Sequence, residues 1–297
     1  MKKISYRIFI SLIILLLSSI IYLSIIGVKT DLFNSKIINQ IKKIDKDLDI
    51  ELKQVSIILN LFKFKLDVKT VGTDLIYKGK VIGIENIKAS ISLKSLIEQK
   101  FLLTGMNIST KSLNIKSLIS FVQLFKKDPR IFIAKHFVKK GYVIADIEIE
   151  FDDLGNIKNN YKINGFIKDG KINILSKYEL DKIDLIFEIQ DKNFKFNDLK
   201  LSLNKKNIFS PQIIILKQDE VYLVSGMINN KKILINKKDI KNFINNKNLG
   251  IDIQEINFNS ENNFNFKIDK NLKINDLNII SEVDLDSLKL KSTFKLI

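Results

Sequence analysis

The sequence contains no cysteine and no tryptophan, and its 297 residues include only two prolines, eleven glycines and one histidine. Zinc ribbons, iron–sulfur centres, disulfide scaffolds and thiol catalysis all need cysteine, so these classes are excluded. His136 alone cannot build a multi-histidine metal site or a relay that needs a second histidine. Because 45% of the residues are hydrophobic, collagen-like and Pro/Gly-rich disordered classes are excluded too. We expect no cofactor and no metal.

Arginine is nearly absent as well. It occurs only at Arg7 and Arg130, so lysine supplies almost all of the positive charge in a chain of formal net charge +16. Proteins that read nucleic acids favour arginine for bidentate contacts with guanine and phosphate, so we expect no nucleic-acid partner. Lysine, isoleucine and asparagine are abundant together, a pattern that low-GC coding alone produces. The charge therefore indicates either solvated lysine faces or a surface that meets anionic lipid headgroups.

The acidic residues do not form a motif for catalysis or metal binding. Asp45, Asp47 and Asp49 begin like a calcium loop, but Ile50 stands where that loop requires glycine. An adjacent pair such as Asp152-Asp153 points to opposite faces of a strand, which is unsuitable for paired carboxylate chemistry. We therefore predict that the chain is not an enzyme, with an anchored hydrolase as the remote alternative.

The longest apolar run lies near the start. Ile8–Ile26 is 19 residues without a charge, roughly 28 Å as a helix, which matches the hydrocarbon thickness of a bilayer. A cleaved signal peptide usually has a shorter apolar region, followed by a small-x-small cleavage site. The residues at the end of this apolar run contain no such site. The sequence therefore predicts an uncleaved membrane anchor, represented by Ile8, Leu15, Leu16 and Ile26.

The orientation of this anchor follows from its flanks. A tail of seven residues rarely crosses a membrane, and the sequence has no second apolar stretch of spanning length. We therefore expect residues 30–297 to lie outside the cytoplasm. The absence of cysteine fits a periplasmic location.

After about residue 50, apolar residues alternate with polar ones, which predicts antiparallel strands with one apolar and one wet face. The apolar positions singled out for such a face are Phe64, Leu66, Val68, Ile87, Ala89, Ile91, Leu93, Val143, Ala145, Ile147, Ile149, Phe151, Leu185, Phe187, Phe264 and Phe266. Turns are expected at Lys78-Gly79, Leu154-Gly155-Asn156, Asp169-Gly170 and Asn229-Asn230. In total we expect about 18 strands.

Three segments have helical rather than strand periodicity. Asp31–Leu48 has apolar residues at helical spacing, with Asp31 as the N-cap. Lys116–Lys140 is expected to be helical, with a break at Pro129, and Lys238–Asn246 shows a weaker helical pattern. These helices can cover only part of the apolar sheet face. The remainder is buried either in a sandwich of two sheets or in a trough open to a lipid chain, and the periodicity allows both.

The combination of a basic tail, one anchor, an amphipathic helix and a run of strands resembles the start of AsmA-like proteins, the group that includes AsmA, TamB and YhdP. The segments that carry the resemblance are Ile84–Leu96 followed by Phe101–Ser109, and the strand–turn–strand unit Tyr161–Lys171. The resemblance is closest over residues 1–120. It implies a mainly β fold, in which a transmembrane helix is followed by an elongated, curled antiparallel sheet (a β-groove, or taco) with a few short helices.

On that basis we expect four parts. They are a cytoplasmic tail and anchor (1–29), a chorein-like helix with the first β-groove segment (30–115), interrupting helices (116–140) and a continued β-groove (141–297). The alternation runs to Ile297 without a capping element, so either the chain belongs to a longer protein or its last strand meets a partner.

The resemblance also implies a function. It predicts an inner-membrane protein with most of its chain in the periplasm, which binds or conducts phospholipid in outer-membrane and envelope biogenesis. Its partners would be membrane phospholipids and, by strand addition, outer-membrane or envelope proteins. The alternative is an anchored β-sandwich that acts as a scaffold or regulator of outer-membrane protein assembly without transporting lipid. A lipopolysaccharide transport accessory is a close variant of the first reading.

Overall fold

The protein is described here from a computed structural model. It describes residues 2–31, 34–35, 38–39, 42, 46–98, 102–125, 129–154, 156–158, 160–174, 178–203, 206–238, 240, 253–271 and 273–291. Most of these residues lie in strands. The chain is therefore mainly β with an apolar helix at its N-terminus, as the sequence predicts.

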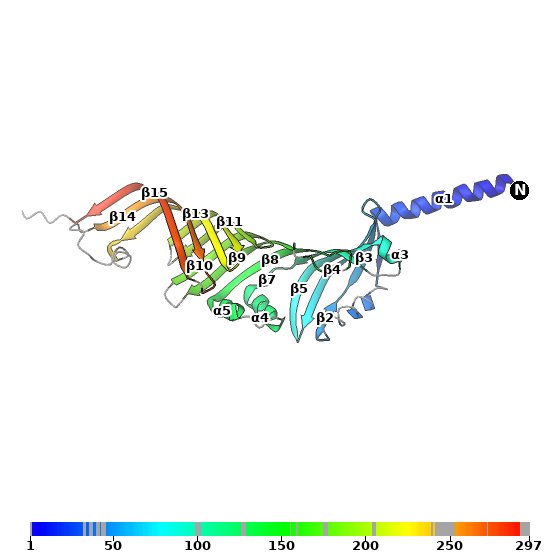
Figure 1. The fold of residues 1–297 in the computed structure, drawn as a ribbon, viewed down its shortest axis with the longest axis horizontal. Helices are drawn as coiled ribbons and strands as arrows, with labels where there is room; N and C mark the ends of the chain where they lie inside the picture. The colour runs from blue at the N-terminus through cyan, green and yellow to red at the C-terminus, as the bar shows by residue number, and fades with distance from the viewer. Residues whose placement is uncertain are drawn as a thin grey trace, which may run out of the picture. The chain divides into compact units, whose positions relative to one another are not determined.

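The strands form one long antiparallel sheet that does not close on itself (Figure 1). They are β1 (Val28–Thr30), β2 (Leu48–Glu51), β3 (Gln54–Asn60), β4 (Lys65–Tyr77), β5 (Lys80–Ser92), β6 (Leu103–Thr110), β7 (Leu113–Asn114), β8 (Val138–Glu150), β9 (Lys162–Ile174), β10 (Tyr178–Gln190), β11 (Asn193–Leu203), β12 (Lys206–Gln218), β13 (Val221–Asn236), β14 (Ile253–Ile268) and β15 (Ile274–Leu290). Along the sheet the order is β1-β3-β4-β5-β6-β8-β9-β10-β11-β12-β13-β14-β15, while β2 pairs with β4 and β7 with β8.

The N-terminal helix α1 spans Lys2–Ile25. Its segment Tyr6–Ile25 is 20 residues with a mean hydropathy of 2.7, long and apolar enough to cross a membrane. Two serines in this segment donate hydrogen bonds to their own helix: Ser18 Oγ to Ile14 O at 2.8 Å and Ser19 Oγ to Leu15 O at 2.9 Å. Because both hydroxyl donors are satisfied within the helix, they do not oppose its placement in hydrocarbon.

Gly27 ends α1 and joins it to the sheet. Its φ of +72° is a left-handed conformation that favours glycine, and its N–H bonds back to Tyr22 O at 3.1 Å. A Cβ at this position would lie 2.5 Å from Ile57 O, so no larger residue fits without displacing β3. The chain then continues as β1, which pairs antiparallel with β3.

Three further helices are described: α3 (Leu93–Ile97), α4 (Ile115–Phe125) and α5 (Pro129–Phe137). The last two account for the predicted helical segment 116–140, with Pro129 at the first position of α5, where its missing N–H is not needed. Of the expected helix over Lys238–Asn246, Lys238 and Ile240 are described and are helical, and the rest lies outside the described residues. Of the expected helix over Asp31–Leu48, residues 34–35, 38–39 and 42 are described and are helical, whereas Leu48 already begins β2. The predicted turn residue Gly155 lies outside the described residues.

The chain divides into two compact units. Unit 1 comprises Met1–His136 and Tyr142–Gly165, and unit 2 comprises Phe137–Gly141 and Phe166–Ile297. In unit 1, α4 covers part of the sheet. The Phe121 ring on α4 packs edge-on against Tyr77 at 6.3 Å between ring centroids, and both residues are buried.

The alternation in unit 1 changes phase within β4, yet its apolar face stays the same. Before Gly72 the inward residues are even-numbered, as at Thr70, and after it they are odd-numbered, as at Thr73 and Tyr77. Gly72 has a φ of +63°, and the hydrogen bond of 3.0 Å between the Thr73 and Thr70 hydroxyls places both side chains on one face. The neighbouring β5 shows a register shift against β6 at the same level.

Similar shifts occur in the middle of strands in unit 2, and they correct two sequence predictions. Asp169-Gly170 lies inside β9 and Asn229-Asn230 lies inside β13, so neither is a turn. Asp169 and Lys232 have left-handed φ values of +51° and +53°, and β13 shifts register against β14 between Asn230 and Ile233. Each interruption of the alternation is an irregularity within one long strand. For this reason the described residues form 15 strands where about 18 were expected.

The predicted turn at Lys78-Gly79 is confirmed, because these two residues connect β4 and β5. Gly79 has a φ of +75°, and a Cβ there would meet no atom within 4 Å.

The apolar face of unit 1 should carry most of its stability. Ile91 is 2% exposed, so Ile91→Ala is expected to lower the free energy of unfolding by about 2–5 kcal/mol. The matched change Val81→Ala, at a side chain 56% exposed on the same strand, should shift it by about 0.5 kcal/mol or less. Urea unfolding of the detergent-solubilised chain, followed by circular dichroism, measures both. Equal effects would show that this face is not the core.

Candidate functional site

The apolar side chains of unit 1 line up in rows that cross its strands. Residues directly opposite one another in paired strands point to the same face of the sheet. The register therefore gives one row of Ile57, Val68, Ala89, Met106 and Ile149, and a second row of Val55, Thr70, Ile87, Ile108 and Ile147. Each row runs over β3, β4, β5, β6 and β8.

Unit 2 has longer rows. One consists of Phe187, Phe196, Ile213, Gly226, Phe264 and Ile279, and the next of Ile189, Phe194, Ile215, Val224 and Phe266. The first row crosses six strands, which is about 24 Å at the usual strand spacing. Gly226 leaves room for a ring, because a Cβ there would lie 2.8 Å from Phe264 Cζ. The Phe264 and Phe266 rings stack at 5.9 Å.

The outer end of these rows is open to solvent. Ile279, Val283, Leu285 and Leu288 of β15 lie opposite Phe264, Ser260, Phe258 and Ile256 of β14. The four β15 side chains are between 44% and 61% exposed. The helices with defined bounds all end before residue 138, so none of them covers the rows of unit 2.

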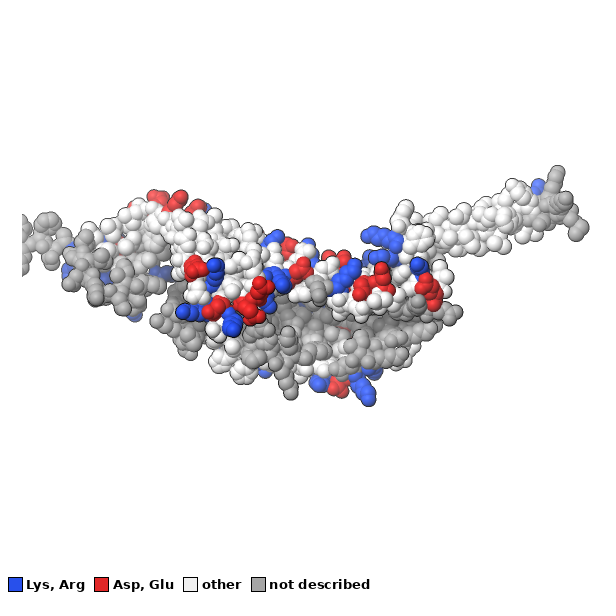
Figure 2. Space-filling view, in the orientation of Figure 1, with Lys and Arg blue, Asp and Glu red and all other residues white. Residues whose placement is uncertain are grey.

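The opposite face of the sheet is charged. Figure 2 shows lysine and acidic side chains interleaved on the visible face of the sheet, whereas most of α1 is uncharged. Pairs across neighbouring strands explain this mixture: Lys88 Nζ lies 3.0 Å from Asp67 Oδ2, and Lys289 Nζ lies 2.7 Å from Glu255 Oε1. These pairs therefore neutralise part of the lysine charge on this face.

Asp184 shows how such a pair holds its charge. Burial raises the pKa of its carboxyl group, but hydrogen bonds from Lys168 Nζ and the Asp169 backbone N–H outweigh burial and leave the pKa below its ordinary value. The same contact raises the pKa of Lys168. Asp184 is therefore ionised at neutral pH.

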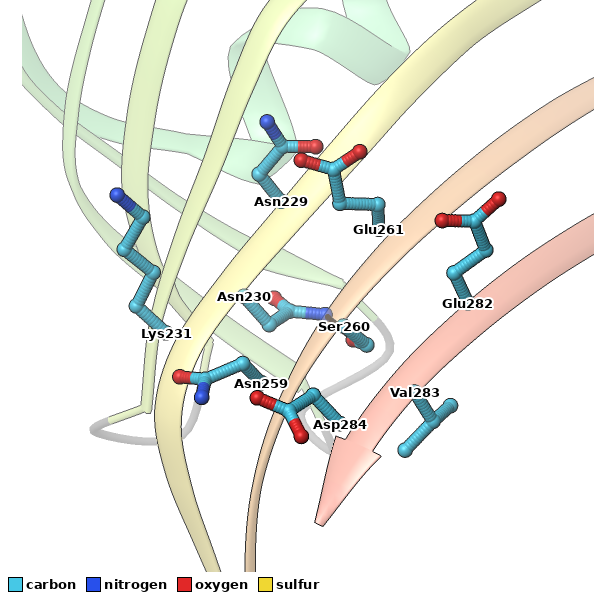
Figure 3. Close-up of a pocket in the computed structure, with 9 residues that line it drawn as sticks. All are labelled: Asn229, Asn230, Lys231, Asn259, Ser260, Glu261, Glu282, Val283 and Asp284. Atoms are coloured by element: carbon cyan, nitrogen blue, oxygen red, sulfur yellow. Dashed lines mark hydrogen bonds between the residues drawn. The ribbon is translucent and has the colours of Figure 1, made fainter. Parts of the chain in front are cut away.

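A polar concavity of about 530 Å³ lies between the middle parts of three strands in unit 2 (Figure 3). It is lined by Asn229, Asn230 and Lys231 of β13, Asn259, Ser260 and Glu261 of β14, and Glu282, Val283 and Asp284 of β15. Within the described part of the chain, no group of three or more His, Cys, Asp or Glu residues has the arrangement of a metal site. The residues of this concavity do not form a metal centre.

Most of the residues predicted to line an apolar face lie on strands. Leu66, Val68, Ile87, Ala89 and Ile91 are on β4 and β5, Val143, Ala145, Ile147 and Ile149 on β8, Leu185 and Phe187 on β10, and Phe264 and Phe266 on β14. Phe64 instead lies in the turn between β3 and β4, Leu93 begins α3, and Phe151 forms an isolated bridge with Ile157. The anchor residues Ile8, Leu15 and Leu16 lie in α1, and Ile26 follows its last residue.

The structure brings some of these residues together. Val68, Ala89 and Ile149 share one row of unit 1, and Phe187 and Phe264 share one row of unit 2. The sequence prediction missed Phe194, Phe196, Ile213 and Ile215. Ile213 to Leu216 is a continuous apolar run that hides the alternation. The residues facing Phe187 could be identified only once the strands were paired.

No protein-family model matches the chain, and no curated protein and no solved structure is significantly similar to it.

The pair of Asp184 and Lys168 makes stability depend on pH. A carboxyl group whose folded pKa is lowered stabilises the fold above its unfolded pKa, and this contribution is lost as the pH falls through the folded value. Asp184→Asn should therefore lower the free energy of unfolding at pH 7 by about 1 kcal/mol or less, because the pair is partly exposed. The difference from the native chain should shrink below about pH 4.

Urea titrations of both chains at a series of pH values measure this difference. The control is Asp191→Asn, in the turn between β10 and β11, where φ is +52° and asparagine is well tolerated. A deficit for Asp184→Asn that stayed constant down to pH 2 would contradict an ionic origin.

Proposed function

We propose that the chain is an AsmA-like, membrane-anchored protein that binds or conducts phospholipid along an apolar β-groove. We place it in the bacterial inner membrane, with most of the chain in the periplasm, where it serves envelope and outer-membrane biogenesis. The observation that supports this proposal is the continuous row from Phe187 to Ile279 on one face of unit 2, whose outer end is exposed.

The dimensions of the row suit an acyl chain. A phospholipid acyl chain covers half of a hydrocarbon core of about 30 Å, or about 15 Å. The row from Phe187 to Ile279 is about 24 Å long by strand spacing, so one acyl chain fits along it. The exposed part of this row is its outer end on β15, and exposed apolar patches mark binding surfaces for apolar ligands or partners.

The irregularities within the strands supply the curvature that a groove needs. A bulge bends its strand and increases the local twist, and designed sheets use bulges to curl. Lys182, Asp198 and Lys232 have left-handed φ values inside β10, β11 and β13, three strands that contribute to the row. We infer that the sheet curls around its apolar face, so that acyl chains are held there while the lysines of the opposite face stay hydrated.

In this function no residue acts chemically. The selectivity of the site would come from its width and its apolar lining. The property that this function requires is an apolar face that stays continuous over several strands. The resemblance of residues 1–120 to AsmA-like proteins supports the same assignment through the order of anchor, helix and strands.

A second candidate, a scaffold that binds another envelope protein, is favoured by the free side of β15. Among the described strands, β15 pairs with β14 alone. Glu282 lies opposite Glu261, and neither Glu282 nor Asp284 has an ionic partner among the described residues. An added strand with lysines on this face and apolar residues on the other would complement both faces.

Neighbouring isoleucines on β15 provide a matched test of lipid binding. Ile279 lies opposite Phe264 on the apolar face, and Ile280 lies opposite Asn263 on the polar face. They are 56% and 63% exposed, so exposure does not separate them. With p-benzoylphenylalanine at either position of the full chain in native membranes, irradiation should give phospholipid adducts severalfold more often at Ile279. Mass spectrometry of the purified chain measures the adducts.

The other outcomes separate the two candidate functions. Equal lipid labelling at Ile279 and Ile280 would show non-specific contact with membrane and overturn the groove. Protein adducts at both positions without lipid would support the scaffold. A third probe at Phe264, which lies inside the row, should repeat the result obtained at Ile279.

A further inference from the structure

The turn between β3 and β4 is unusually apolar. Leu61, Phe62 and Phe64 are 40%, 103% and 72% exposed, with Lys63 between the phenylalanines. Turns are normally built from small and polar residues, as in this sheet at Asp219-Glu220, which joins β12 to β13. Three large apolar side chains in solvent need a cause other than turn formation.

A fourth exposed apolar residue lies on the short helix beside this turn. The Leu93 N–H, at the start of α3, donates a hydrogen bond of 3.0 Å to Phe64 O. The same short helix ends at Ile97, which is 85% exposed, and carries Lys94 on its surface. We call Leu61–Phe64 together with Ile97 the apolar tip.

The backbone of the tip is fixed and strained. Lys63 N–H bonds to Asn60 Oδ1 at 3.1 Å and Phe64 N–H to Leu61 O at 3.2 Å, which closes the turn. Phe64 adopts a φ of +49°, a conformation that glycine or asparagine takes readily and a bulky residue does not. Neither side-chain burial nor backbone preference accounts for phenylalanine at this position, and such residues concentrate at functional sites.

The apolar tip lies at the end of the strands where α1 joins the sheet. β1 follows α1 directly and pairs antiparallel with β3, with Val28 opposite Ile57. The chain therefore runs away from α1 along β1 and back toward it along β3. The turn after Asn60 extends beyond the level of Val28 in the direction of the helix, and α1 contacts β3 at this junction.

We propose that the apolar tip is a second membrane contact, seated in the interfacial layer of the bilayer that α1 crosses. Phenylalanine rings and an isoleucine enter the boundary between headgroups and acyl chains, where aromatic residues concentrate, at the level of Tyr22 near the end of α1. Lys63 and Lys94, together with Lys29 after the helix, face the anionic headgroups. This proposal rests on α1 as the anchor and is independent of lipid transfer.

The contact would orient unit 1 on the membrane. An anchor of one helix leaves the attached domain free to tilt, whereas a helix and a tip on neighbouring strands fix two points. The apolar face then begins close to the lipid surface, because Leu66 and its partners Leu59 and Ile91 lie one residue beyond the first pair of the turn, Asn60 and Lys65.

The absence of cysteine permits a direct test with single-cysteine variants of the full chain. Phe62→Cys, at one end of β4, is compared with Val81→Cys, which is 56% exposed on β5 beside the other end of β4. The 13 residues of β4 place the two positions about 40 Å apart. Each variant is labelled with the environment-sensitive fluorophore NBD and reconstituted in phosphatidylcholine–phosphatidylglycerol vesicles, some of which carry lipids spin-labelled near the headgroup.

We expect the probe at Phe62 to emit at shorter wavelength and to be quenched about twofold or more by the spin-labelled lipids, with little change at Val81. Equal behaviour of the two probes, or an aqueous spectrum at Phe62, would overturn the proposal. Lipid adducts at Ile279 are scored separately, so a failure here leaves the proposed function untouched.

A second variant separates insertion from folding. Phe64→Gly relieves the strained φ, so its melting temperature should stay equal to that of the native chain or rise. Combined with Phe62→Ser, it should nevertheless abolish quenching of a probe at Ile97→Cys. Quenching at Ile97 that survives in this folded variant would show that the phenylalanines do not hold the tip in the membrane.

Discussion

The fold depends on keeping one face of the sheet apolar within each of its two units. The side-chain period of a strand is two, so a single inserted or distorted residue would turn every later apolar side chain to the wrong face. In this chain the apolar–polar alternation of the sequence changes phase at the same positions where the backbone is distorted. At Gly72 and at Lys232, the sequence changes phase where the backbone takes a left-handed φ, and the apolar face continues.

This compensation explains why strands of 13 to 17 residues occur where shorter ones were expected. A flat strand of that length would add little curvature, whereas a strand with an irregularity in the middle bends there. Small buried residues stand near such points, among them Thr70, Ser210 and Ser260. Each of these hydroxyl oxygens takes part in a hydrogen bond: Thr70 accepts from the Thr73 hydroxyl, Ser260 accepts from the Asn230 amide, and Ser210 donates to Met227 O.

Period-two alternation was enough to predict a mainly β chain and most of the strand residues in the candidate face, and the uncharged run Ile8–Ile26 predicted the apolar helix before them. Phe187 and Phe264 were both recognised, but their common row was not, because register depends on pairing between distant segments. Asp169-Gly170 and Asn229-Asn230 have the composition of turns, and local sequence cannot separate a turn from a mid-strand bulge. Phe64 was assigned to a strand for the same reason: two alternating residues follow it, yet the turn extends through it.

The connection at Gly27 joins the sheet to the apolar helix α1. The helix ends in a left-handed glycine that lies against Ile57 O, and β1 follows it directly, so α1 and β3 meet at one junction. Charge is absent from the helix between Ile8 and Ile25 and is placed on one face of the sheet, while apolar residues occupy the other face from Leu66 onward. The proposed function, in which apolar ligands are held against a membrane, requires this continuity rather than any reactive group.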